Sequence, residues 1–421
     1  MSRMATWKKA PAVFVGVAGV LAASLMGCSR TGRPLIVPQH ALDLKLPTNN
    51  DDTYLTPNPL PPGRRGDLIT SINKGPSAAF GGANRTDLLY HSVNSRSEDV
   101  AVSGVLLVPS SSPPDGGWPL ISWAHGTMGI SDRCAPSHYP NLGFDDAANY
   151  LRLLLISGYA VVATDYIGLG TPGVHTYMSA IDQGNAVADI VPAARRLNPY
   201  LSATWFVSGH SQGGAAALDA TRAGEGGEIP AGLAGTIAIA PGNSTDRVPS
   251  AVIDGSDRDP FAPLLDMYVL IGAAASDPRV QPNSVLSAQG KRLIQTIPHG
   301  MCLLEYFDHS DKLPEASVFS NNQDAIAGLE PRLARYGNPD SLPTRGPVLV
   351  VTGDADTVVP AVGTFQLIYR LRHLGSEIDE VVLPGQDHMQ PLLNSLCLQL
   401  RFLNKHGGPT PRPHTNCVPS Q

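Results

Sequence analysis

The sequence predicts an α/β fold, in which a mostly parallel sheet carries helices on both faces and an inserted helical cap. Apolar strand-like runs alternate with helical stretches along most of the chain. This alternation stops in residues 243–343, which separate two predicted strands by far more chain than a crossover connection needs. The 421 residues are 42% hydrophobic and only 16% charged, which is enough for one large domain with such an insertion.

The amino-terminal segment predicts export from the cytoplasm. Three basic residues precede an apolar run, Ala10 to Met26, whose length is typical of a signal peptide and short for a membrane-spanning helix. The run ends in Leu25-Met26-Gly27-Cys28, which resembles the lipobox of bacterial lipoproteins. We therefore expect residues 1–27 to be a lipoprotein signal peptide and Cys28 to carry the lipid that anchors the chain to a membrane. An uncleaved amino-terminal anchor is the alternative.

The rest of the chain divides by composition. Residues 28–63 are rich in proline, asparagine and threonine and predict a tether followed by an extended wrap over the domain. Residues 64–242 and 344–421 form the predicted core, with 243–343 as the inserted cap. The net charge of −6 gives no sign of a nucleic-acid partner.

The core elements follow from the spacing of apolar residues. Apolar runs predict strands at 87–93, 100–108, 119–124, 159–164, 204–208, 235–240, 347–352 and 380–383. Helical spacing predicts helices at 145–156, 182–197, 214–219 and 361–374, and one in the cap at 261–275. The first helix is expected to end at Ser157-Gly158, because glycine tolerates the left-handed conformation that ends helices. Asp182 is expected to start the second helix.

The most informative motif is Gly209-His210-Ser211-Gln212-Gly213, which lies between a predicted strand and a predicted helix. The turn is too tight for a Cβ at either glycine, and the serine hydroxyl must stand clear of the sheet. A serine in this strand–turn–helix context is the nucleophile elbow of the α/β-hydrolase fold. An ordinary glycine-rich turn is the alternative, because glycine and serine are common residues.

A serine nucleophile needs a base, and the base needs an orienting acid. In α/β-hydrolases these follow the serine in the chain order acid, then histidine. Asp354 and Asp356 follow the strand at 347–352, and Asp387 and His388 follow the last strand, where ligand sites of parallel sheets lie. We assign His388 as the base and Asp356 as the acid. Asp354 competes for the second role, and Asp387 is expected to be exposed rather than catalytic.

Acyl-transfer chemistry also needs hydrogen-bond donors for a developing oxyanion. The backbone N–H of Gln212, directly after the nucleophile, is the expected first donor. A second donor is expected in the turn His125-Gly126-Thr127, which follows another central strand. We assign it to the N–H of Thr127, with or without its hydroxyl, and keep Gly126 as the alternative. His125 is expected to pack and form hydrogen bonds rather than act as a base.

Six short segments together resemble the secretory lipases of the lipase A type found in yeasts and actinobacteria. They are Asp52-Thr53-Tyr54-Leu55-Thr56-Pro57 leading to Gly66-Asp67-Leu68-Ile69, Trp123-Ala124-His125-Gly126-Thr127, Cys134-Ala135-Pro136-Ser137, and Val162-Ala163-Thr164-Asp165-Tyr166 with Gly168-Leu169-Gly170-Thr171-Pro172. With the elbow and the acid and histidine loops, the resemblance extends over roughly residues 50–405. The combined set is far more specific than the elbow alone.

The resemblance implies an α/β-hydrolase fold with a helical cap, and hydrolysis of carboxylic esters without a metal or other cofactor. It favours Asp356 over Asp354 as the acid. We therefore expect an exported lipase or esterase whose partners are an acyl-ester lipid substrate and, through the lipid anchor, a membrane. An acyltransferase with the same triad and a non-catalytic lipid-binding lipoprotein are the alternatives. The natural ester, its acyl chain length and the oligomeric state are left open.

Four cysteines remain besides Cys28, and an even number in an exported chain suggests two disulfides with three possible pairings. No pair has the Cys/His spacing of a zinc site. The resemblance implies a bond between Cys134 and Cys302 that ties the oxyanion region to the cap, and leaves Cys397 to pair with Cys417. The lipoprotein signal departs from the family, because many of its members are simply secreted.

Overall fold

The computed structural model describes residues 55–222, 229–247, 261–297, 302–303, 305 and 318–410. The predicted signal peptide, the lipid site at Cys28, and Cys417 lie outside these residues, as does most of the predicted tether. Within the described residues, no helix combines the length and the apolar character that a membrane span requires.

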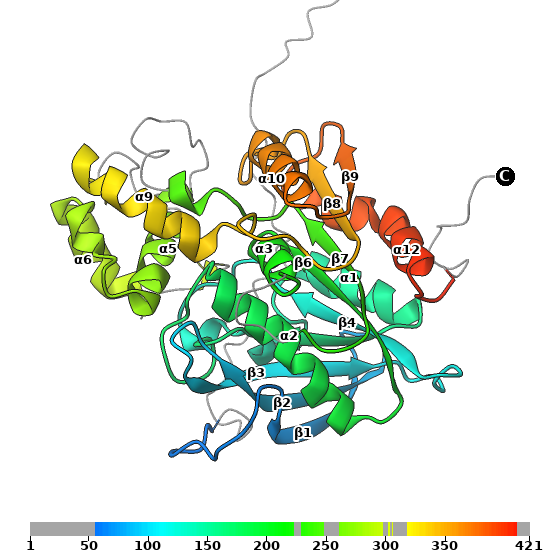
Figure 1. Cartoon of the computed structure of the whole chain (residues 1–421). Coiled ribbons are helices and arrows are strands. Elements are labelled where there is room, and N and C mark those ends of the chain that lie inside the picture. Colours follow the sequence, from blue (N-terminus) through cyan, green and yellow to red (C-terminus); the bar gives the residue numbers. More distant parts are fainter. Residues whose placement is uncertain are drawn as a thin grey trace, which may run out of the picture. The chain divides into compact units, whose positions relative to one another are not determined.

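One sheet organises the described part of the chain. Its nine strands are β1 (Leu68–Ser77), β2 (Ala83–Val93), β3 (Asp99–Val108), β4 (Trp118–Ala124), β5 (Ala160–Thr164), β6 (Leu201–His210), β7 (Leu233–Ile239), β8 (Val348–Gly353) and β9 (Ile378–Leu383). Their order is β1-β2-β3-β5-β4-β6-β7-β8-β9 (Figure 1). The first three strands run antiparallel to their neighbours, and β5, β4, β6, β7, β8 and β9 are all parallel.

The parallel strands occupy the places that apolar runs predicted. Every residue of β5 and β8 is buried, as expected for strands covered on both faces. β1 was not predicted, because its residues are partly or fully exposed and form no continuous apolar run. It adds an edge strand that pairs only with β2.

Helices cover both faces of the sheet. They are α1 (Asp145–Ile156), α2 (Ala180–Leu197), α3 (Gln212–Asp219), α10 (Ala361–His373), α11 (Gln390–Asn394) and α12 (Leu396–Lys405). One hydrophobic cluster joins α1, α11 and α12 to one face, while α2 and α3 pack in a second cluster on the other face. α10 joins α3 over β7 and β8 in a further cluster. The predicted layering, with helices on both faces of a mostly parallel sheet, is confirmed.

Two helix boundaries show how local chemistry decides where a helix begins and ends. α1 has the predicted bounds and is followed by Gly158, which has a φ of 94°. α2 begins at Ala180 rather than at Asp182, because Ser179 is the residue that caps it. The Ser179 hydroxyl accepts a hydrogen bond from the Asp182 N–H at 3.3 Å, so Asp182 belongs to the first turn of the helix.

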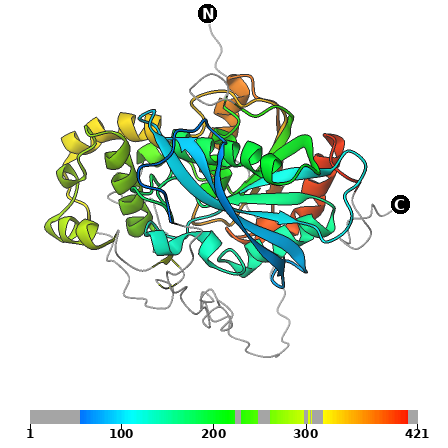
Figure 2. The same ribbon diagram turned by 90° about the horizontal axis from the view of Figure 1, so that it is seen from below.

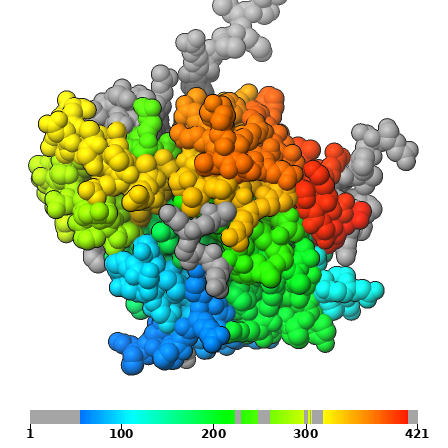
Figure 3. Space-filling model, viewed as in Figure 1, coloured from blue at the N-terminus to red at the C-terminus, as the bar shows by residue number. Residues whose placement is uncertain are grey.

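The interval assigned to the cap is helical where the structure describes it. Its helices are α5 (Ala262–Ser276), α6 (Ala288–Thr296) and α9 (Gln323–Gly337), and they gather at one end of the sheet (Figures 1 and 2). Their hydrophobic cluster also contains Tyr177, Met178 and, in α3, Ala215. The cap therefore packs directly on the helix that follows the elbow. Near α9, Asp340 forms an ion pair with Arg370 of α10, and the two regions adjoin on the surface (Figure 3).

Candidate active site

Ser211 stands at the sharp turn between β6 and α3. Its φ of 60° and ψ of −121° are strained for a residue with a side chain, and backbone bonds to Ile239 O and from Gly242 N hold the turn. A Cβ on Gly209 would collide with the backbone of Gly213, and a Cβ on Gly213 would collide with the end of β4. Both glycines are therefore required by close backbone approach, as the sequence predicted.

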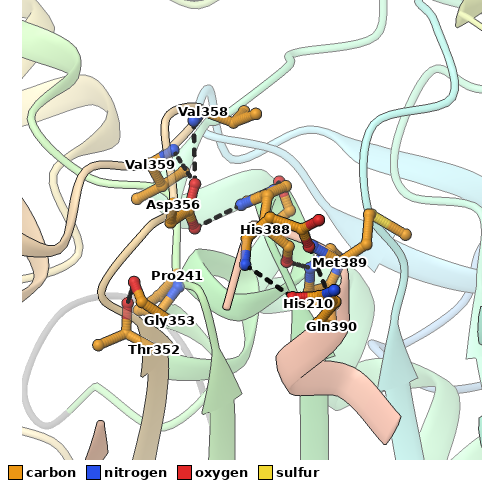
Figure 4. A network of polar contacts seen from close by, with 12 residues as sticks. His210, Pro241, Thr352, Gly353, Asp356, Val358, Val359, His388, Met389 and Gln390 are labelled. Atoms are coloured by element: carbon orange, nitrogen blue, oxygen red, sulfur yellow. Dashed lines mark hydrogen bonds and ion pairs between the residues drawn. The ribbon is translucent and has the colours of Figure 1, made fainter. Parts of the chain in front are cut away.

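The structure brings Ser211, His388 and Asp356 together. The Ser211 Oγ lies 2.8 Å from His388 Nε2. His388 Nδ1 lies 2.7 Å from Asp356 Oδ2 (Figure 4). Asp356 and His388 are buried, whereas Ser211 is partly exposed. Each follows a different parallel strand at its carboxyl end, so three loops distant in sequence meet at one edge of the sheet.

Hydrogen bonds around Asp356 fix how the histidine is protonated. Asp356 Oδ1 accepts from the backbone N–H groups of Val358 and Val359, at 2.9 and 2.8 Å (Figure 4). Its other oxygen therefore faces His388 Nδ1, which must carry a proton in order to donate to it. The neutral imidazole then has an unprotonated Nε2 facing the Ser211 hydroxyl, which is the tautomer that a general base needs.

Asp354, which competed for the role of the acid, and Asp387 both make other hydrogen bonds. Asp354 is exposed, and its Oδ1 accepts a hydrogen bond from the N–H of Gly385 at 2.5 Å, which links two loops. Asp387 is half-buried, and its Oδ1 accepts from the N–H groups of Met389 and Gln390, both at 3.0 Å. Asp387 thus holds the start of α11 and the loop around His388, a role that the sequence analysis did not assign. Among the described residues, neither of these side chains forms a hydrogen bond or ion pair with His388.

The turn expected to hold the second oxyanion donor lies against the elbow. A Cβ on Gly126 would lie only 3.7 Å from Ser211 Cβ, which places this turn beside Ser211. In the described part of the chain, the N–H groups of Thr127 and Gln212 donate no hydrogen bond to protein. Gln212 is the first residue of α3, where helix N–H groups lack partners within the helix and favour negative charge. Both N–H groups are therefore free, among the described residues, to donate a hydrogen bond to a bound ligand.

Two contacts around these donors were not predicted. The Thr127 hydroxyl lies 2.8 Å from Tyr177 Oη, and the Gln212 side-chain amide donates to His175 Nε2 at 3.2 Å. Burial lowers the pKa of His175 to about 4, so the ring is neutral and its Nδ1–H donates to Ile167 O. Neither Tyr177 nor His175 belongs to a recognisable motif, so no sequence signal pointed to them.

His125 is buried beside this region. Its ring lies 4.2 Å from the ring of Tyr166, and Tyr166 Oη donates to its carbonyl oxygen at 2.8 Å. Burial lowers the pKa of His125. These contacts agree with the packing role expected for this residue.

A disulfide joins Cys134 to Cys302 across 168 residues. Beside it, the Leu303 N–H donates to Met128 O at 2.8 Å, so the segment after the turn His125-Gly126-Thr127 is bonded to the cap interval twice. Cys397 is also disulfide-bonded. Its pairing with Cys417 remains a prediction, because Cys417 lies outside the described residues. Among the described residues, no three His, Cys, Asp or Glu side chains are grouped so that they could hold a metal ion.

This sheet, with a serine at a strained elbow and a histidine and an acid on later loops, defines the α/β-hydrolase class of folds. Solved structures of the same fold include lipase A from Candida antarctica, with a TM-score of 0.71 and 19% identity over 88% of this chain and 90% of that chain. The rice cell wall degrading esterase LipA from Xanthomonas oryzae has a TM-score of 0.67 and 21% identity over 82% of this chain and 100% of that chain. A structure from Legionella pneumophila described as a putative hydrolase has a TM-score of 0.68 and 18% identity over 81% of this chain and 99% of that chain.

At these identities the likeness establishes the fold. The chain has the α/β-hydrolase fold, and the resemblance to lipases of the lipase A type is confirmed at that level. No protein-family model matches the chain, and no curated protein matches it in sequence.

Proposed function

We propose that this protein is a serine carboxylic-ester hydrolase of the lipase or esterase type, which cleaves acyl esters through an acyl-enzyme. The observation that carries the proposal is the line of hydrogen bonds from Ser211 through His388 to Asp356. Two solved structures of the same fold, a lipase and an esterase, support the choice of esters as the substrate class.

Acylation begins when the Ser211 oxygen attacks the ester carbonyl carbon and its proton passes to His388 Nε2. Asp356 stabilises the imidazolium that forms, through the bond at Nδ1. The carbonyl oxygen becomes an oxyanion, and the N–H groups of Gln212 and Thr127 donate to it. When the intermediate collapses, the alcohol leaves with the proton from His388, and the acyl group stays on Ser211.

Deacylation repeats these steps with water. His388 takes a proton from the water, whose oxygen attacks the acyl carbon, and the second oxyanion uses the same two donors. The carboxylic acid leaves, and the proton returns from His388 to Ser211. No step requires a metal ion or a cofactor.

The proposed setting is outside the cytoplasm. The apolar run and the lipobox-like segment at residues 25–28 support export and lipid attachment at Cys28. A lipid anchor would hold the active site close to a membrane and to substrates with acyl chains. Cleavage of acylglycerols or related acyl lipids is therefore the finer form of the proposal.

The test is hydrolysis of p-nitrophenyl esters with acyl chains of increasing length. We expect turnover by the native protein and none by Ser211→Ala. Ser208→Ala is a matched control, because Ser208 lies on the same strand and its hydroxyl is hydrogen-bonded to Tyr150 Oη, at 2.8 Å, rather than to His388. Turnover by a folded Ser211→Ala protein would contradict the assignment. Free acid as the main product in the presence of a competing alcohol distinguishes hydrolysis from acyl transfer.

A further inference from the structure

We infer that His210, the residue before the nucleophile, is a positioning residue that binds the loop of the catalytic base to the elbow. This inference rests on the proposed function, because it assigns His210 a part in the same reaction. His210 belongs to the pentapeptide that marks the elbow, but neither the sequence pattern nor the mechanism above gives its side chain a task.

The inference rests on a hydrogen bond between the elbow and the loop that carries His388. His210 Nε2 lies 2.8 Å from the backbone carbonyl oxygen of His388 (Figure 4). The two rings lie near each other as well, with centroids 4.8 Å apart and planes tilted by 47°. His210 is buried, with 5% of its surface exposed, so solvent does not compete for this bond.

This bond completes a closed ring of contacts. Ser211 Oγ bonds to the His388 side chain, the His388 carbonyl bonds to the His210 side chain, and His210 and Ser211 share a peptide bond. The nucleophile and the base are therefore held together by both the side chain and the main chain of His388. Asp356 orients the imidazole ring, but it does not fix the distance from the His388 backbone to the elbow.

The protonation state of His210 suits this role. A carbonyl oxygen only accepts hydrogen bonds, so Nε2 of His210 must carry the proton. Burial lowers the pKa of His210 to about 3, and the nearby His388 contributes to the lowering. The titratable groups that face it are His388 and Asp356. His210 is thus a neutral donor, and it places no second positive charge beside His388 when that ring takes up the serine proton.

Other hydrogen bonds also support the loop that carries His388, among them the bond from the Gly385 N–H to Asp354 Oδ1. Asp387 fixes the start of α11 through two backbone N–H groups, directly after the base. In the described part of the chain, the bond from His210 is the hydrogen bond that joins the peptide of His388 to the elbow, and without it the His388 side chain alone makes that link. A small displacement of a reacting group costs one to two orders of magnitude in rate. The expected defect is therefore in kcat rather than in substrate binding.

Three substitutions of His210 distinguish the contribution of its hydrogen bond from the contribution of its side-chain volume. His210→Phe keeps a ring of similar size without a donor, and His210→Asn has an amide that is one bond too short to reach the carbonyl. His210→Gln places an amide nitrogen at the same number of bonds from Cα as Nε2. We expect the Phe and Asn variants to lose about tenfold to a hundredfold in kcat with KM within about twofold, and the Gln variant to recover most of it.

A second readout does not depend on substrate. The Nδ1–H proton of His388, shared with Asp356, is followed as a low-field resonance by proton NMR. We expect it to shift or broaden in His210→Phe and His210→Asn and to return in His210→Gln. His91→Phe is the matched control, because His91 is another buried histidine with a hydrogen bond, to Asp99, on the distant strand β2. It is expected to lower the melting temperature without changing kcat.

The inference is overturned if folded His210→Phe or His210→Asn keeps native kcat and the native resonance, or if His210→Gln is no better than His210→Asn. If the Phe variant does not fold, the Asn and Gln pair decides. If the native protein hydrolyses no ester, the proposed function fails, and the resonance still tests the link between His210 and His388.

Discussion

Replacing Asp356 by asparagine is expected to reverse the protonation of His388. The structure dictates how the new amide must lie. The backbone N–H groups of Val358 and Val359 both point at one carboxylate oxygen, so the amide oxygen must stay there. The amide NH2 group then faces His388 Nδ1 across the present distance of 2.7 Å. Two donors cannot share that position, so His388 must release the proton from Nδ1.

The consequence falls on the other ring nitrogen. In the neutral imidazole the proton moves to Nε2, which lies 2.8 Å from Ser211 Oγ and can no longer accept the serine proton. Turning the amide around would leave two backbone donors facing an NH2 group, at a cost of about 1–3 kcal/mol for each unsatisfied group. Loss of the correct tautomer lowers kcat about 10⁴-fold in serine hydrolases, which corresponds to about 5 kcal/mol in the activation barrier.

The assay is the kcat for p-nitrophenyl butyrate, measured on protein whose circular dichroism and melting temperature match those of the native chain. Asp354→Asn is the control, because the Asp354 side chain is exposed and accepts one backbone hydrogen bond that an amide oxygen can also accept. We expect it to keep kcat within about twofold. A folded Asp356→Asn protein with more than about a tenth of native kcat would refute the tautomer argument, as would an equal loss in Asp354→Asn.

Three other predictions concern donors, glycines and pH. Thr127→Val should lower kcat about tenfold to a hundredfold, because the Thr127 hydroxyl, which bonds to Tyr177 Oη, orients the second oxyanion donor. Thr127→Ser should restore kcat, and a native kcat in Thr127→Val would contradict the role of the hydroxyl. Gly213→Ala should lower the free energy of unfolding, measured by urea denaturation, by several kcal/mol. Gly328→Ala in α9, where a Cβ has no neighbouring atom, should raise it by about 0.5–1 kcal/mol. The pKa of His175 is about 4 in the folded chain, against an ordinary value of 6.5. Between these pH values the unfolded chain binds a proton that the folded chain lacks, so the free energy of unfolding decreases as the pH falls from 6.5 toward 4. His175→Phe should flatten that slope in unfolding curves, and an unchanged slope would contradict it.

The central sheet was predictable because its chemistry is local. Parallel strands buried on both faces must be apolar along their whole length, and β8, Val348–Gly353, is such a run. The elbow was predictable because its backbone geometry excludes side chains at Gly209 and Gly213. The order of acid and histidine along the chain then indicated which loops approach Ser211.

The remaining features depend on contacts between distant segments. β1, Leu68–Ser77, is a partly exposed edge strand, and only pairing with β2 gives it regular structure. The choice between Asp354 and Asp356 rested on the resemblance to lipases, whereas the structure shows the contact itself, from the Asp356 side chain to His388. His210 stands in the printed motif, yet its bond to the His388 carbonyl spans 178 residues, which no local pattern encodes.

The hydrophobic cluster of the cap has a consequence for redesign. Because Tyr177, Met178 and Ala215 belong to it together with residues of α5, α6 and α9, the cap is not a detachable module. Excising it to obtain a minimal catalyst would expose apolar side chains beside the elbow itself. A cap grafted from another hydrolase would have to pack against the surface that Tyr177, Met178 and Ala215 form. Evolution of specificity in this chain is therefore expected to proceed by substitution within the cap rather than by exchange of the whole segment.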